Sequence, residues 1–152
     1  MGATSITTVR QALRDQIAAL SGTAYAGTWK ETVFPLGILE EPATRGHLAF
    51  SVVDEGSENN GHRGRDGGTI ANLIRFRVSF LYQMRPSAAD MMTSWDLSSD
   101  AAEDVIRALM GQSTSWSDAF WVRYRRFERV RLSDSSWLTI NLFFDVEHEL
   151  TV

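Results

Sequence analysis

The sequence predicts an α+β fold in which an antiparallel or mixed sheet of about four main strands carries two helices on one face. Two segments repeat apolar residues at the three- and four-residue steps of a helix, and others alternate apolar and polar residues as strands do. The elements follow in the order helix, strands, helix, strands, which is typical of a sheet covered by helices on one side. The 152 residues contain no linker, so we expect a single domain over 1–152.

Both predicted helices are amphipathic. The first spans 8–20, where Thr8 followed by Gln11 matches a capping box and Ser21 precedes a glycine stop. The second spans about 90–110 and ends at Gly111. The apolar stripe of the first helix contains Val9, Leu13, Ile17 and Leu20. That of the second contains Met92, Trp95, Ser99, Ala102, Val105, Ile106 and Leu109.

The strands are predicted from alternation. The clearest covers 74–82, preceded by a strand at 48–52 and followed by two closing strands at roughly 121–132 and 137–150. A further short strand within 29–34 is compatible with the sequence. The apolar residues that should face the helices are even-numbered: Phe76, Val78, Phe80, Leu138, Ile140, Leu142 and Phe144.

The segment 55–69 contains no large apolar residue, and it is rich in glycine and asparagine. Such a segment cannot offset its ordering entropy by packing, which predicts a long mobile loop. Its ends are acidic and then basic. Because loops of this length are usually functional or disordered, we expect a partner-contact loop, with these residues making the contacts: Glu55, Glu58, Arg63 and Arg65.

Composition excludes several classes of function. The chain has no cysteine, which excludes disulfides, thiolate catalysis and cysteine-based metal sites. A net charge of −4 argues against a general nucleic-acid binder. The first residues lack the apolar core of a secretory signal, and no apolar run is long enough to span a membrane. We therefore expect synthesis in the cytoplasm and no membrane contact.

Nothing in the sequence predicts catalysis or a cofactor. The segment 111–115, followed by Asp118 and His148, approaches a nucleophile elbow but has Ser115 where glycine is required and follows a helix rather than a strand. The segment 61–64 has the form of a GXXG loop but joins strands, whereas that loop should join two helices. Both segments are better explained as polar connections.

A metal site is not expected either. Asp100, Glu103 and Asp104 cluster on the second helix, but Glu103 forms an i,i+4 pair with Arg107, which is typical of a solvated face. The three histidines do not have the spacing of metal ligands; they are His47, His62 and His148.

The closing hairpin carries an arginine stripe. We predict a register in which Arg125 faces Asp145 and Phe127 faces Phe143, because opposite charges and paired aromatics stabilise neighbouring strands. Arg123 then faces Glu147, which neutralises part of the stripe. The remaining residues form an amphipathic patch on the outer sheet face, and they are our candidates for a subunit interface: Phe127, Arg129, Arg131 and Phe143.

The order of elements resembles a known family. An amphipathic helix leads through an irregular stretch with Pro35 and Pro42 to a strand, a long polar loop and a long strand. A helix carrying Trp95 and ending in 105–109 follows, and the final hairpin ends in the strand 137–149. Over nearly the whole chain this resembles the tail-terminator proteins of long-tailed bacteriophages.

The resemblance implies a structural protein of the virion, located in the tail or neck and assembled in the host cytoplasm. Such proteins form a ring, usually a homo-hexamer, on the last ring of the tail tube protein. They stop tube growth and present the surface to which the head–tail connector or stopper protein docks, while genome DNA passes through without sequence-specific binding. They need no cofactor and are not enzymes. Two alternatives stay open: another head–tail joining protein, such as a stopper or tube subunit, and a small ligand-binding or enzymatic domain with a cavity between sheet and helices.

Overall fold

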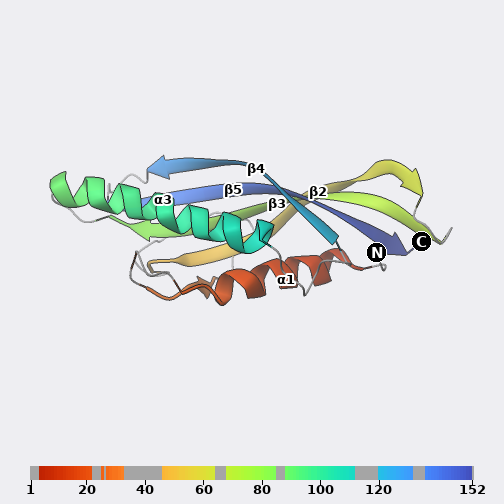
Figure 1. The fold of residues 1–152 in the computed structure, drawn as a ribbon, viewed down its shortest axis with the longest axis horizontal. Helices are drawn as coiled ribbons and strands as arrows, with labels where there is room; N and C mark the ends of the chain where they lie inside the picture. Colours follow the sequence, from red (N-terminus) through yellow and green to blue (C-terminus); the bar gives the residue numbers. More distant parts are fainter. Residues whose placement is uncertain are drawn as a thin grey trace.

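In a computed structural model of the chain, a five-stranded mixed sheet carries two helices on one of its faces (Figure 1). The structure describes residues 4–21, 25, 27–32, 46–63, 68–84, 88–111, 120–131 and 136–151. The predicted α+β class is confirmed. The sheet contains one strand more than the four main strands predicted, the two-residue β1, Lys30–Glu31.

The sheet order is β1-β2-β3-β5-β4. Strand β1 pairs with β2 in parallel, and all other neighbours are antiparallel. The centre consists of β3 and β5, which pair without a register shift from Thr69 opposite Thr151 to Gln83 opposite Trp137. The long strands are β2 (Ala49–Arg63), β3 (Thr69–Gln83), β4 (Phe120–Arg131) and β5 (Trp137–Thr151).

Helix α1, Ile6–Ala18, begins two residues before the predicted start. Its N-cap is Ser5, whose side chain accepts a hydrogen bond of 3.0 Å from the Thr8 amide. The predicted cap at Thr8 is therefore wrong: the Ser5 hydroxyl already satisfies the amide that an N-cap side chain serves. The predicted apolar stripe is confirmed at its centre, where Val9, Leu13 and Ile17 are buried.

Helix α3, Ala88–Met110, lies beside α1 on the same face of the sheet (Figure 1). Ala102, Val105 and Leu109 are buried as predicted. Met92 is 63% exposed, so its predicted place in the buried stripe is wrong. The helix ends at Gly111, whose amide donates to the Arg107 carbonyl at 2.6 Å; a side chain at Gly111 would collide with that same oxygen.

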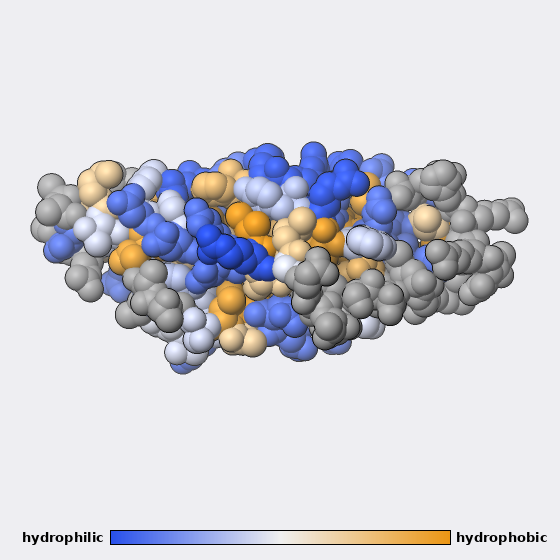
Figure 2. All heavy atoms as spheres, in the orientation of Figure 1, coloured by the Kyte–Doolittle hydropathy of each residue, from blue (hydrophilic) through white to orange (hydrophobic). Residues whose placement is uncertain are grey.

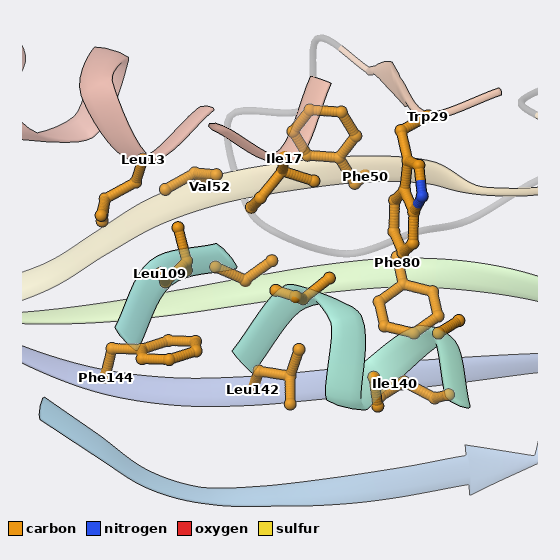
Figure 3. Close-up of a cluster of buried hydrophobic side chains, with 14 of the residues drawn as sticks. Leu13, Ile17, Trp29, Phe50, Val52, Phe80, Leu109, Ile140, Leu142 and Phe144 are labelled. Carbon is orange, nitrogen blue, oxygen red and sulfur yellow. The ribbon is translucent and has the colours of Figure 1, made fainter. Parts of the chain in front are cut away.

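The core lies between the helices and the inner face of the sheet, the face that the helices cover. Figure 3 shows side chains from α1, α3, β2, β3 and β5 meeting there. Trp29, just before β1, packs edge-on against Phe80 with 4.9 Å between ring centroids. The predicted even-numbered set is buried throughout, which confirms the assignment of the inner face for β3 and β5.

The predicted loop at 55–69 is wrong over most of its length, because β2 continues to Arg63. This distal half of β2 pairs with β3 from Gly56 opposite Arg75 to Arg63 opposite Ile70, with register shifts at 54–56 and 59–63. Its partner β3 is held on the other side by β5. Main-chain hydrogen bonds to a fixed strand suffice to order the segment, and the side chains of 55–59 are exposed to solvent. Residues 64–67, with Arg65, lie outside the described residues.

The predicted register of the closing hairpin is also wrong. A bulge lies between Tyr124 and Arg126, so that Tyr124 faces Phe144 and Arg126 faces Phe143. A single register could not satisfy both halves of β4. Because of the extra residue, odd-numbered side chains point outward before the bulge, as Arg123 does, and inward after it, as Arg129 does.

Candidate functional site

The bulge places Phe127 and Arg129 on the opposite face of the sheet from Phe143, so the predicted interface residues are divided between the two faces. Arg129 points toward α3, where its guanidinium lies 4.1 Å from the Trp95 ring centroid and donates to the Ser99 hydroxyl at 2.7 Å. Burial lowers the pKa of Arg129 from its usual value, and the carboxylate of Asp96 acts in the opposite direction. Arg129 is thus a structural contact between β4 and α3, and the prediction that it is free on the outer face is wrong.

Phe127 lies beside Arg129, with 5.6 Å between its ring centroid and the guanidinium carbon, and is 40% exposed. Phe143 is half-buried on the outer face, the face away from the helices, where the Arg126 guanidinium lies 4.0 Å from its ring centroid. The side chain of Arg131 lies outside the described residues. The expected patch of Phe127, Arg129, Arg131 and Phe143 therefore does not form one surface.

The outer face instead carries charge in four columns, one on each long strand. On β2 the column is acidic, with Glu58 3.1 Å from Arg75 and Glu55 3.6 Å from Arg77. These two arginines form the basic column of β3. The β5 column is acidic and the β4 column basic, joined by Arg125–Asp145 at 3.6 Å and Arg123–Glu147 at 3.8 Å. Six of these eight side chains are at least 38% exposed, so each pair contributes little to stability.

The two ion pairs predicted for the hairpin are therefore present although the register is not. Arg125 is the bulged residue and Arg123 lies opposite Asp145, so both arginines reach their partners diagonally. Of the predicted partner-contact residues, Glu55 and Glu58 belong to the acidic column of β2. The side chain of Arg63 and all of Arg65 lie outside the described residues.

Large apolar side chains are exposed near this charged region. Trp121, on β4 beside Arg123, is 64% exposed, and Val130 further along the strand is 46% exposed. Trp121 and Arg123 line a shallow, open hollow together with Asp145 and Glu147 of β5. On the opposite side of the molecule, Figure 2 shows hydrophobic surface near the C-terminal turn of α3 and hydrophilic surface along β4.

The histidine of the elbow-like motif has a structural contact. His148 is buried, with its Nε2 2.9 Å from the Asn72 side-chain nitrogen and its Nδ1 3.1 Å from the Thr4 carbonyl. These partners fit a neutral ring that carries its proton on Nδ1. Burial lowers its pKa from the usual 6.5, against the effect of the Thr4 contact. Residues 112–119 of the motif lie outside the described residues.

The carboxylates on α3 are bound to side chains of the protein. Arg107 donates to Glu103 at 2.8 Å, which confirms the predicted pair, and to Asp104 at 3.2 Å. Asp104 also accepts from the Tyr25 hydroxyl at 2.8 Å. Across the described ranges no group of histidine and carboxylate side chains is arranged to hold a metal ion. None of the described helices is both long and apolar enough to cross a membrane.

Sequence reasoning missed the inward turn of Arg129, although a signal was present. Apart from the exposed Trp121, the apolar residues of β4 have even numbers up to Tyr124, and the next one is Phe127. A change of parity within one strand indicates an inserted residue. The adjacent arginines 125 and 126 mark its position.

No family model and no curated protein matches the sequence. Among solved structures, the chain is similar to a chain of the virion of a native gene transfer agent (GTA) particle. The two are 18% identical with a TM-score of 0.50, and the likeness covers 97% of this chain and 99% of that one. At this identity the likeness shows a shared fold, and it shows that fold from end to end.

Proposed function

We propose that the protein is a structural subunit of a phage-like virion, and specifically a tail terminator. The observation that supports this most is the end-to-end likeness to a chain of a virion particle, with neither chain having a substantial part that the other lacks. The order of helices and strands that resembles tail terminators is also that of the structure, although most of the long polar loop is a continuation of β2. This is an argument from fold and therefore needs a functional test.

The surface of the described residues supports a role in assembly. Exposed Trp121, Phe127 and Val130 lie along one edge of the sheet, and columns of arginine and carboxylate cross the outer face beside them. Aromatic residues and arginine are enriched where proteins meet. In the proposed function, six copies form a ring on the end of the tail tube, stop its growth and offer the opposite rim to the connector. DNA passes through this ring without sequence-specific contacts.

We place the docking contact at the distal end of the β2–β3 hairpin. This end of the sheet extends beyond α1 (Figure 1), and the predicted contact residues Glu55 and Glu58 lie on the way to it. Replacing 64–67 by a Gly-Ser segment of equal length should leave folding and ring formation intact and abolish joining to the tube or the connector. Normal joining by that variant would contradict this placement.

The test of the function itself has two stages. Native mass spectrometry and electron microscopy of the purified protein should show a ring, most simply a hexamer, that forms as the concentration rises. Added to growing tail tubes, the ring should cap them and fix their length. A monomer at every concentration would contradict the ring. A ring that binds the connector but never the tube end would identify the protein as another head–tail joining subunit.

A further inference from the structure

The sheet has two edges at which the described residues provide no further partner strand. At one edge lies β4, which is paired only with β5. At the other lies β2: among the described strands, β1 pairs with it at Ala49 and Phe50, and its distal half pairs with β3. Unpaired edges expose main-chain donors and acceptors and are ready to pair with another chain.

The two edges run in opposite directions. Strand β4 is antiparallel to β5, β5 to β3, and β3 to β2. A second copy placed beside the first, with its helices on the same side of the sheet, therefore brings its β2 antiparallel to β4. Antiparallel pairing is the more stable arrangement per residue. The directions of the strands thus allow the sheet of one copy to continue into that of the next.

Charge favours this continuation over other pairings. Across the outer face the columns alternate: acidic on β2, basic on β3, acidic on β5 and basic on β4. A β2 strand placed after β4 adds an acidic column next to a basic one and preserves the alternation. Pairing β4 with β4, or β2 with β2, would place like charges opposite each other, which destabilises neighbouring strands.

The four columns of charged side chains also lie at the same level along the direction of the strands. The pairings align Arg123 with Asp145, Asp145 with Arg75, and Arg75 with Gly56, which lies between Glu55 and Glu58. Neighbouring copies need not slide past each other to bring the acidic and basic edges together. Trp121, exposed beside Arg123, would be covered in the same contact, as aromatic residues at the centre of an interface are.

We propose that copies of this chain join head to tail, with β4 of one pairing antiparallel with the distal half of β2 of the next. The contact is heterologous, using a different edge on each copy, and such contacts generate rings when the rotation closes. The inference deepens the proposed function by naming the surfaces that join the ring. It also explains why both edges are charged: the charges reject indiscriminate partners and admit the complementary edge.

Charge reversal tests the pairing. One variant combines Arg123→Glu and Arg125→Glu, a second combines Glu55→Lys and Glu58→Lys, and a third carries all four changes. Each double variant should raise the concentration needed for assembly by at least about tenfold, equivalent to about 1.4 kcal/mol. The fourfold variant should regain assembly, and so should an equimolar mixture of the two double variants.

The control is Arg107→Glu, which breaks two ion pairs of an exposed arginine on α3 but lies on neither edge. It should assemble like the unmodified protein, and circular dichroism should show all variants folded. If the unmodified protein forms rings and the double variants assemble equally well, the edge pairing is overturned but the proposal of a ring is not. Unmodified protein that stays monomeric at every concentration would overturn both.

A second measurement, chemical cross-linking, does not require the fold to tolerate reversed charges. The chain has no cysteine, so Arg123→Cys and Glu58→Cys in one chain introduce a unique pair of thiols. A short bis-maleimide should then link copies into a ladder that stops at the size of the ring. Each single-cysteine variant should give at most linked pairs in low yield. Equal ladders from the single variants, or none from the double variant when rings are present, would overturn the proposal.

Discussion

Phe143 and Phe144 are adjacent on β5, and the same substitution at each should have very different costs. Phe144 points inward, is 1% exposed and packs against Tyr124 with 5.7 Å between ring centroids. Truncating such a side chain to alanine leaves a cavity, and we expect Phe144→Ala to lower the free energy of unfolding by about 3–5 kcal/mol. That is a large part of the total stability of an ordinary domain.

Phe143 points outward, is only half-buried and lies under the guanidinium of Arg126 at 4.0 Å. Phe143→Ala forfeits about half of the roughly 1.5–3 kcal/mol that full burial contributes, and a cation–π contact of about 0.5–1 kcal/mol. We therefore expect a loss of about 1.3–2.5 kcal/mol, at least about 0.5 kcal/mol less than for Phe144→Ala. The difference arises only from the face on which each ring lies.

Urea unfolding followed by circular dichroism measures both losses. It should be performed at a protein concentration below that of assembly, because association adds apparent stability. The urea dependence of the free energy should be unchanged in both variants, so that the midpoints report stability alone. Equal losses for Phe143→Ala and Phe144→Ala, or a larger loss for Phe143→Ala, would refute the assignment of the two faces.

Three further outcomes follow from the described contacts. Because burial holds the pKa of His148 below its usual 6.5, the unfolded chain binds a proton that the folded chain does not, and the free energy of unfolding should fall as pH drops below about 6.5. In His148→Gln, the midpoint of urea unfolding should depend less on pH. Ser5→Ala should cost about 1 kcal/mol through loss of the N-cap of α1, more than Thr8→Ala; the reverse order in thermal unfolding would restore Thr8 as the cap. Deleting the bulged Arg125 keeps the side chains of both halves of β4 on their present faces and should lower the free energy of unfolding by about 1 kcal/mol. Deleting Glu128 should lower it more, because that deletion turns Arg129 away from Ser99 and Trp95. Equal melting temperatures for the two variants would contradict the bulge.

The parts of the fold that the sequence predicts are those in which periodicity reports burial directly. The inner faces of β3 and β5 and the stripe of α1 follow from apolar residues at regular steps. The distal half of β2 could not be predicted in this way, because its order comes from main-chain hydrogen bonds to β3 and its side chains remain polar. Local composition does not record a partner strand that is distant in the sequence.

The candidate surface was predicted only in part. Glu55, Glu58 and Arg125 do lie exposed on the outer face, where Arg125 pairs with the largely buried Asp145, because charge and alternation are visible in the sequence. The faces of Phe127 and Arg129 were predicted wrongly because one inserted residue reverses every side chain after it. Knowing that β2 and β4 are the two edges requires the strand order, which the sequence does not state.

The uninterrupted ladder between β3 and β5 also has a consequence for how the chain acquires its structure. The middle of the sheet joins a strand near the centre of the sequence to the last strand to be synthesised. Contacts so far apart in sequence close late and slow the search for the native state. During translation β2 and β3 can form a hairpin, but the apolar inner face of that hairpin stays exposed to solvent until β5 has emerged from the ribosome. Folding should therefore complete only after β5 has been synthesised, and nascent chains that stall before Trp137 should be the species that chaperones bind.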